Sequence, residues 1–376
     1  MMEQISTWFM QALSTVLAWF FALTGGALLL PVPIQITTGP AVMIVSESEY
    51  AVLWATNRRG TGSLVVTAGG EERVFNDAGS GTLRSDDTLH AARVPKAALD
   101  ACDTYRVESQ YVLFNMGYFA FMGRRASSAE RAFRGYAGQE EIRALFFTDV
   151  HDDRAQAMRN AAALTQEAPA DLVIFAGDLC ELKVQKDFVD GIVGLAADMS
   201  GGSIPVLYCR GNHETRGQWA TEMRRYFPTR TGEMYYTADY GPIAFTVLDT
   251  GEDKQDDHPE YFGMADFAAY RAQEDAWLRA LAPAPGYDYR VCVAHSSSLD
   301  RAGFYDNWYL PLRGNLGVTH VFCGHGHRNQ TWVSNDVRCY EDGGPSTGSL
   351  LVFRDGGIYA WSVASPGEIR DFGKLE

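Results

Sequence analysis

The segment Leu207–Glu214, with the sequence LYCRGNHE, decides the fold because a buried strand passes directly into polar residues with ligand chemistry. Four other apolar runs end in the same way, each in a carboxylate or an imidazole. They are FFTDVH at 146–151, VIFAGD at 173–178, VCVAH at 291–295 and VFCGHGH at 321–327. Five of the eight histidines therefore lie at predicted strand ends, where chance placement would scatter them.

The runs that carry these motifs alternate with helical stretches. Ile142–Thr148, Leu172–Ala176 and Ile204–Cys209 are predicted strands, with predicted helices at Ala155–Thr165 and Phe188–Met199. Ile243–Leu248, Tyr289–Ala294 and Val318–Cys323 continue the pattern, and a hairpin is predicted around residues 349–362. The alternation predicts an α/β core with largely parallel pairing, in which ligands meet beyond the carboxyl ends of the strands.

The residue types at these ends suit metal chemistry. Imidazole and carboxylate together favour manganese, iron or zinc, and the lack of thiolates disfavours a structural zinc site. Glycine before Asp178, Asn212 and His325 lets the backbone turn sharply where ligands converge. Each motif alone is weak, but the ordered set D-x-H, G-D, G-N-H-E, H, G-H-x-H is a strong signal.

This ordered set resembles the calcineurin-like metallophosphoesterase superfamily, from about Ile142 to the C-terminus. The resemblance implies a four-layer α-β-β-α sandwich and two divalent or trivalent ions, with Mn, Fe, Zn or Mg as candidates. It implies that Asp149, His151, Asp178 and His327 bind one ion. It implies that Asp178, Asn212, His295 and His325 bind the other, with Asp178 as the bridging ligand.

The resemblance also implies a reaction. A hydroxide that bridges the ions is expected to attack the phosphorus of a phosphate mono- or diester, with His213 as general acid. Arg210 is a candidate phosphate ligand, with a structural salt bridge as its alternative. Asp249 is a candidate for orienting His213, with Glu181 as its alternative.

Departures from two branches of the superfamily narrow this expectation. Purple acid phosphatases carry tyrosine where this chain has Glu181, and their first motif lacks the histidine found here at 151. Protein serine/threonine phosphatases extend the second motif to G-D-x-x-D-R-G, whereas this chain continues as GDLCELK. Neither a purple ferric centre nor a protein phosphatase of that type is expected.

The first 135 residues predict two further parts. Residues 1–35 contain an uncharged apolar stretch at 7–30, interpreted as a membrane anchor, an export signal or a helix docked on the protein. Residues 36–135 contain short predicted strands with a break at 57–60, which indicates a small all-β sandwich. This sandwich loosely resembles the fibronectin-type module of purple acid phosphatases, and residues 136–376 form the predicted catalytic domain.

The net charge and the spacing of the cysteines narrow the kinds of substrate and of protein that the sequence allows. The net charge of −15 weighs against long nucleic acid as a substrate, so a small phosphate ester is expected. The six cysteines include no CxxC pair, and the four in or beside predicted core strands, Cys180, Cys209, Cys292 and Cys323, are interpreted as buried free thiols. The rivals are a nuclease of the same superfamily and a non-catalytic adaptor with a degenerate metal site.

Overall fold

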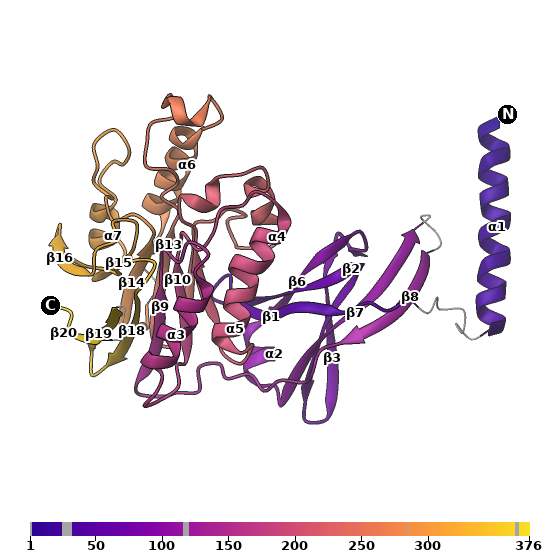
Figure 1. Cartoon of the computed structure of the whole chain (residues 1–376), viewed down its shortest axis with the longest axis horizontal. Helices are drawn as coiled ribbons and strands as arrows, with labels where there is room; N and C mark the ends of the chain where they lie inside the picture. Colours follow the sequence, from indigo (N-terminus) through magenta and orange to yellow (C-terminus); the bar gives the residue numbers. More distant parts are fainter. Residues whose placement is uncertain (1, 25–31, 116–119, 284, 365–367) are drawn as a thin grey trace.

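The computed structural model describes residues 2–24, 32–115, 120–283, 285–364 and 368–376. Two β-sheets lie face to face, with helices on both outer sides (Figure 1). The larger sheet has the order β20-β19-β18-β9-β10-β11-β1-β2-β7-β8, and β3 and β6 also pair with β2. The smaller sheet has the order β12-β13-β14-β15-β17-β16.

The strands of the larger sheet are β1 (Ile36–Ile44), β2 (Glu49–Ala68), β3 (Glu71–Asn76), β6 (Asp87–Pro95), β7 (Thr104–Asn115), β8 (Ala120–Ser127), β9 (Ile142–Phe147), β10 (Leu172–Ala176), β11 (Val206–Cys209), β18 (Gly348–Arg354), β19 (Gly357–Ala364) and β20 (Glu368–Lys374). The smaller sheet contains β12 (Tyr236–Tyr240), β13 (Ile243–Leu248), β14 (Tyr289–Ala294), β15 (His320–Cys323), β16 (Gln330–Ser334) and β17 (Val337–Glu341). A separate pair is formed by β4 (Ala78–Gly79) and β5 (Thr82–Leu83).

Helices connect and cover these strands. The α-helices are α1 (Met2–Thr24), α2 (Lys96–Asp100), α3 (Arg154–Leu164), α4 (Gln185–Asp187), α5 (Leu195–Ser200), α6 (Phe267–Ala280) and α7 (Tyr309–Gly314). A π-helix, η1 (Phe188–Gly194), joins α4 to α5. Three short 3-10 helices are η2 (His213–Thr215), η3 (Ala220–Arg225) and η4 (Pro259–Tyr261).

Side-chain alternation along the central strands produces the layers. One set of residues, including Ile174 of β10 and Val293 of β14, packs between the two sheets. The opposite faces pack against helices, so that Phe175 meets the α3–α5 side and Cys292 meets α6 and α7. Because each central strand is apolar on both faces, it is buried on both faces. The expected four-layer α-β-β-α architecture is therefore confirmed.

The pairing of the central strands is parallel, as predicted. β9, β10 and β11 are parallel neighbours, and so are β13, β14 and β15. Their carboxyl ends lie at one edge of the sandwich. The predicted hairpin near residue 355 is present as β18 and β19.

The N-terminal all-β region differs from the expectation in two ways. The predicted break at 57–60 is wrong, because β2 runs through it: residues 57–59 face solvent, while Gly60 is buried and paired with Tyr111. In addition, β1 pairs in parallel with β11, so the larger sheet continues from this region into the catalytic part. A fibronectin-like module, with the domain boundary near residue 135, therefore remains a prediction.

Helix α1 covers most of the apolar N-terminal stretch, and residues 25–30 of that stretch lie outside the described residues. The described side chains of α1, at 7–20, are mostly exposed. Within the described residues, none of the helices combines the length and apolar character needed to span a membrane.

Candidate metal centre

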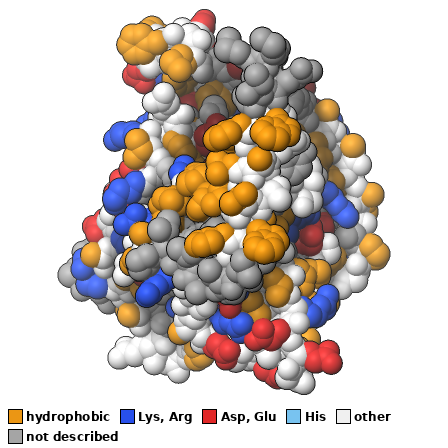
Figure 2. Space-filling view, turned by 90° about the vertical axis from the view of Figure 1, so that its right-hand side faces the viewer, with side chains coloured by type: hydrophobic (Ala, Val, Ile, Leu, Met, Phe, Trp, Pro, Cys, Tyr) orange, Lys and Arg blue, Asp and Glu red, His pale blue; other side chains and the backbone are white. Residues whose placement is uncertain are grey.

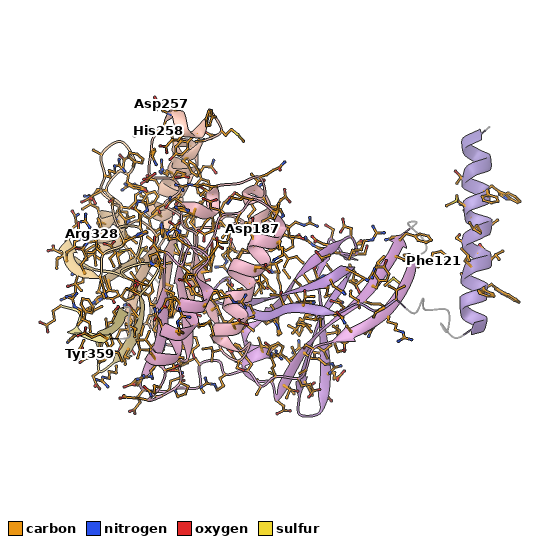
Figure 3. The ribbon with its side chains drawn as sticks, in the orientation of Figure 1. Phe121, Asp187, Asp257, His258, Arg328 and Tyr359 are labelled. Carbon is orange, nitrogen blue, oxygen red and sulfur yellow. The ribbon has the colours of Figure 1, made fainter. Side chains whose placement is uncertain are left out.

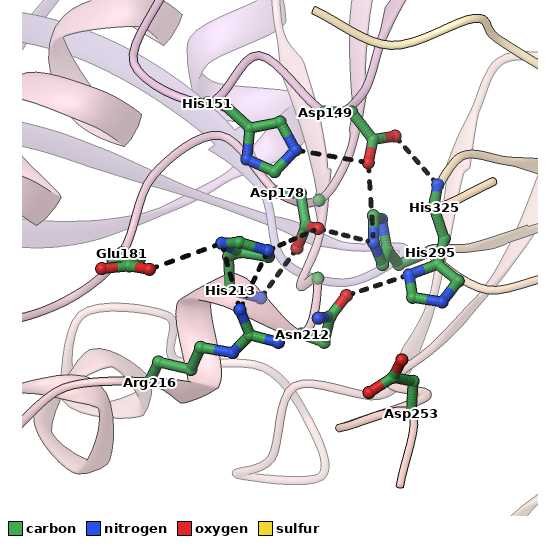
Figure 4. A network of polar contacts seen from close by, with 12 residues as sticks. Asp149, His151, Asp178, Glu181, Asn212, His213, Arg216, Asp253, His295 and His325 are labelled. Atoms are coloured by element: carbon green, nitrogen blue, oxygen red, sulfur yellow. Dashed lines mark hydrogen bonds and ion pairs between the residues drawn. The ribbon is translucent and has the colours of Figure 1, made fainter. Parts of the chain in front are cut away.

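The strand-end turns that carry the predicted ligands have an unusual backbone. Asp149, His151, Asp178, His325 and His327 all adopt a positive φ, between 45° and 72°. Such values are uncommon for residues other than glycine, and they cluster at functional sites where the surrounding structure imposes them. The cluster of strained residues therefore coincides with the predicted ligands (Figure 4).

Glycines beside the ligands allow the turns to approach one another. A Cβ on Gly177, at φ 86°, would lie 2.4 Å from the backbone nitrogen of Gly211. A Cβ on Gly324 would lie 2.0 Å from Oγ1 of Thr148. Both contacts are far inside van der Waals distance, so these positions require glycine.

Asp149 lies at the centre of one group of ligands. Its side chain is fully buried and accepts hydrogen bonds from Oγ1 of Thr148 at 2.7 Å and from the backbone N–H of His325 at 2.9 Å. Nε2 of His327 lies 3.0 Å and Nε2 of His151 3.7 Å from Oδ1 of Asp149. One possible ligand atom each of Asp149, His151 and His327 lies within 4.8 Å of the others.

Asp178 joins this group to a second one. Its Oδ2 lies 3.0 Å from Nε2 of His295, and its Oδ1 accepts the backbone N–H of His213 at 2.8 Å. Nδ1 of His295 lies 2.7 Å from the carbonyl oxygen of Ala176, to which it donates. That bond fixes the ring so that Nε2 faces the cluster, as metal-binding histidines require. Asp178, His295 and His325 form a further set within 4.8 Å.

The side-chain amide of Asn212 lies within the second group. One of its terminal atoms is 3.1 Å from Nδ1 of His325 and from Nε2 of His295, and 3.2 Å from Oδ2 of Asp178, and the other is 2.9 Å from Nη2 of Arg216. With the NH2 group toward Asp178 and the oxygen toward Arg216, both ends of the amide have hydrogen-bond partners. With the two ends exchanged, the amide oxygen would lie among Asp178, His295 and His325, where it could serve as a metal ligand.

Electrostatics in the cluster are dominated by the two carboxylates. Burial would lower the pKa of His295, but Asp178 and Asp149 outweigh it and raise the pKa to about 10. Burial alone would raise the pKa of Asp178, yet His295 and His213 hold it well below its usual range. The hydrogen bond to Asp149 raises the pKa of His327. A cation that binds here would therefore displace protons from imidazoles.

His213 lies beside the ligands, at the start of η2. Its Nε2 is 3.8 Å from Oδ2 of Asp178, and its Nδ1 is 3.7 Å from Oε1 of Glu181. Nη1 of Arg216 lies 3.0 Å from Nε2 of His213. Arg216 is held by two hydrogen bonds to Glu252, at 2.7 and 3.1 Å. A guanidinium and an imidazole thus converge next to the predicted ligands, about one-third exposed.

Arg210 and Asp249 face each other. Their side chains form a buried ion pair of 2.6 Å, and Tyr270 donates to Asp249 at 2.8 Å. Arg210 thus takes the structural salt bridge that the sequence left as its alternative. Within the described part of the chain, the side chain of Asp249 contacts Arg210 and Tyr270 rather than His213, whereas Glu181 lies near the His213 ring. Any catalytic role of Arg210 or Asp249 remains a prediction.

Three residues at the site escaped the sequence analysis. Glu214 is fully buried and accepts backbone N–H groups from Asp178, Leu179, Cys180 and Gly211, at 2.9, 2.6, 3.4 and 2.9 Å. It therefore holds the turn after β10 against the turn after β11. The others are Arg216 and Glu252. Glu214 stands in the quoted GNHE motif, but Glu252 follows Arg216 by 36 residues, so no local pattern links that pair.

The remaining histidines, His90, His258 and His320, and the cysteines do not belong to the candidate ligand groups described above. His90 is buried beside Thr56, and His320 lies within β15, where burial lowers its pKa to about 4. His258 accepts the backbone N–H of Glu260 at the start of η4. All six cysteines are free, and the four that were predicted to lie in core strands are buried, as is Cys339.

The fold and the site together define an α/β protein with a histidine and aspartate metal-binding cluster at its strand ends. The family description for calcineurin-like phosphoesterases matches residues 142–329, half of the chain. The chain belongs to the calcineurin-like phosphoesterase family, a family of hydrolases that typically bind divalent metals.

Comparison with curated proteins gave no match. Among solved structures, GAP50, described as the anchor in the inner membrane complex of Plasmodium, is 14% identical, covers 63% of this chain and 90% of its own, and has a TM-score of 0.43. Phosphopantetheinyl hydrolase from Mycobacterium tuberculosis is 16% identical, with 55% and 91% covered and a TM-score of 0.33. A putative 5'-nucleotidase from Staphylococcus aureus is 13% identical, with 62% and 53% covered and a TM-score of 0.35.

Proposed function

We propose that this protein is a dinuclear metal-dependent hydrolase of small phosphate mono- or diesters. The observation that carries the proposal is the overlap of three ligand sets. One contains Asp149, His151 and His327, another contains Asp178, His295 and His325, and a third joins His151, Asp178 and His213. Two cations bound in the outer sets would be neighbours, with Asp178 as the ligand between them.

The donor set fits such ions. Asp149, His151, Asp178 and His327 would hold one cation, and Asp178, Asn212, His295 and His325 the other. When bound, a pair of cations supplies hydroxide at neutral pH and positive charge for the phosphoryl oxygens. The mixture of imidazole, carboxylate and amide donors suits manganese, iron or zinc, with magnesium as a weaker candidate.

The chain's own residues complete the chemistry. His213, as general acid, protonates the departing oxygen from the ring nitrogen beside Asp178. Arg216 donates its N–H groups to a phosphoryl oxygen, and its paired contacts with Glu252 keep the guanidinium aimed at the site. The bound phosphate takes the place of the present contact between Arg216 and His213.

The net charge supports a small substrate. A protein of net charge −15 repels a polyanionic strand, and cations bound in the site neutralise one phosphate group locally. A small ester therefore fits better than long nucleic acid.

The test is turnover of matched p-nitrophenyl mono- and diesters by metal-stripped protein, after add-back of Mn, Fe, Zn or Mg. We expect activity to return with about two ions bound per chain, by elemental analysis. Asp178→Asn should lose metal and activity, whereas Asp257→Asn, at an exposed loop position, should retain both. Full turnover by Asp178→Asn with both metals retained, or wild-type protein that binds no metal, would contradict the proposal.

A further inference from the structure

The β7–β8 hairpin extends away from the rest of the fold, at the end of the molecule farthest from α7 (Figure 1). Its turn, at 116–119, lies outside the described residues, and the strand ends beside the turn carry aromatic side chains. Phe114 pairs in register with Phe121, and their ring centroids are 4.4 Å apart. Phe114 is 38% exposed although it is large and apolar. Phe121 is labelled near this end in Figure 3.

Four arginines surround the hairpin just behind these rings. They are Arg58 and Arg59 of β2 and Arg124 and Arg125 of β8, and all are exposed. Arg59 donates to the carbonyl oxygens of Val112 and Leu113, so its guanidinium lies close to Phe114 in the ladder. Arg58 lies over the ring of Tyr111, at 5.6 Å. Arg125 donates a hydrogen bond to Glu108 at 3.2 Å, and Glu108 also accepts a hydrogen bond from Arg106, which lies farther from the aromatic rings along β7.

This local charge is opposite to that of the whole chain. With 47 acidic and 32 basic side chains, the surface as a whole is negative. Four arginines around an aromatic end therefore form a positive collar on an acidic protein. Apolar rings at the tip, with cationic groups behind them, match the depth profile of a bilayer interface, where acyl chains lie beneath anionic headgroups.

Helix α1 supplies a second apolar element at the same end of the molecule in Figure 1. Trp8 and Trp19 are 72% and 70% exposed, and residues 7–24 carry no charge. Figure 2 faces this end and shows hydrophobic side chains gathered across its middle, with Lys and Arg side chains to either side and Asp and Glu side chains mainly below. Exposed aromatic side chains in such number mark an interaction surface.

We propose that the β7–β8 hairpin is a membrane-contact site, at which Phe114 and Phe121 enter the interface of an anionic bilayer and the four arginines bind its headgroups. The charge pattern selects lipid over a second copy of the same hairpin, because two positive collars repel each other. The inference is independent of the catalytic proposal, since none of these residues belongs to the metal cluster.

The test is partition of the full-length protein between buffer and vesicles of neutral phosphatidylcholine, with or without 30% phosphatidylglycerol. Because α1 is uncharged from residue 7 onward, that stretch of the helix should contribute no gain from the anionic lipid, and the arginine variants measure how much of the gain the four arginines supply. Each arginine near an anionic surface contributes about 1 kcal/mol, so Arg124→Gln with Arg125→Gln should weaken partition on the order of 25-fold on anionic vesicles. On neutral vesicles the same pair should change little.

The matched control is Arg313→Gln with Leu310→Ser on α7, at the opposite end, where both side chains are exposed. It should bind both vesicle types as wild type does. Phe114→Ser, with an unchanged unfolding temperature, should weaken binding to both. Wild-type partition that is equal on neutral and anionic vesicles would overturn the proposal. So would self-association without vesicles that the arginine variant abolishes, because the occupant would then be a second copy.

Discussion

The coupling between metal binding and the protonation of His295 gives a quantitative prediction. The ring is fully buried between Asp149 and Asp178, which raise its pKa to about 10. At pH 7 only about one stripped molecule in a thousand then has a neutral ring that can accept a cation. We therefore expect metal affinity to rise about tenfold for each pH unit between pH 7 and 9, with a proton released from His295.

Calorimetric titration of stripped protein with Mn²⁺, in buffers of different ionisation enthalpy, counts the protons released. His295→Gln should release about one proton fewer than wild type. His320→Gln is the matched control, since that buried histidine is already neutral, with a pKa of about 4. An affinity that does not change with pH, or an equal proton count in His295→Gln, would refute the reasoning.

Three further predictions concern the surroundings of the ligands. His213→Ala, with metal content unchanged, should lower kcat on the order of 100- to 10,000-fold for esters with poor leaving groups, and far less for p-nitrophenyl esters. Arg216→Ala should mainly raise KM, about tenfold or more, because it removes a charged donor to the phosphoryl group; an unchanged KM would exclude that contact. Glu214→Ala should lower the free energy of unfolding by about 3 kcal/mol or more, measured by urea denaturation, because four buried N–H groups lose their acceptor. The control Glu181→Ala, at a partly exposed position, should change that free energy by less than about 1 kcal/mol.

Much of the fold and of the ligand set was predictable because both depend on short sequence patterns. A strand that is apolar on both faces, such as β10, appears in the sequence as a continuous run of apolar residues. The polar residue that follows the run, Asp178, marks the end of the strand. Parallel pairing then brings distant strand ends to one edge without further information. Order and position therefore bring the candidate ligands to one edge, whereas their assignment to two ions comes from the family resemblance and remains a prediction.

What the sequence did not predict depends on partners far along the chain. The ion pair between Arg216 and Glu252 and the ion pair between Arg210 and Asp249 each join residues that are far apart in the sequence. The polar residues at 57–59 look like a loop, yet they belong to β2, because exposed positions on a long strand tolerate them. The combination of aromatic and basic side chains at the β7–β8 hairpin could not be predicted, because Arg59 comes from another strand, β2.

Strand β2 links the two ends of this molecule, with a register shift between Ala55 and Gly60. It pairs with β7 over one part of its length and with β1 over another, and β1 pairs with β11, which leads into Asn212 and His213. Further register shifts lie in the pairing of β1 with β2 and of β7 with β8. A body that rests on a bilayer through its hairpin would hold the reaction centre away from the lipid, and bending at these shifts would change its height and angle. Soluble esters, or headgroups carried on long flexible tethers, could reach it there, whereas phosphates within the headgroup plane beneath the hairpin could not.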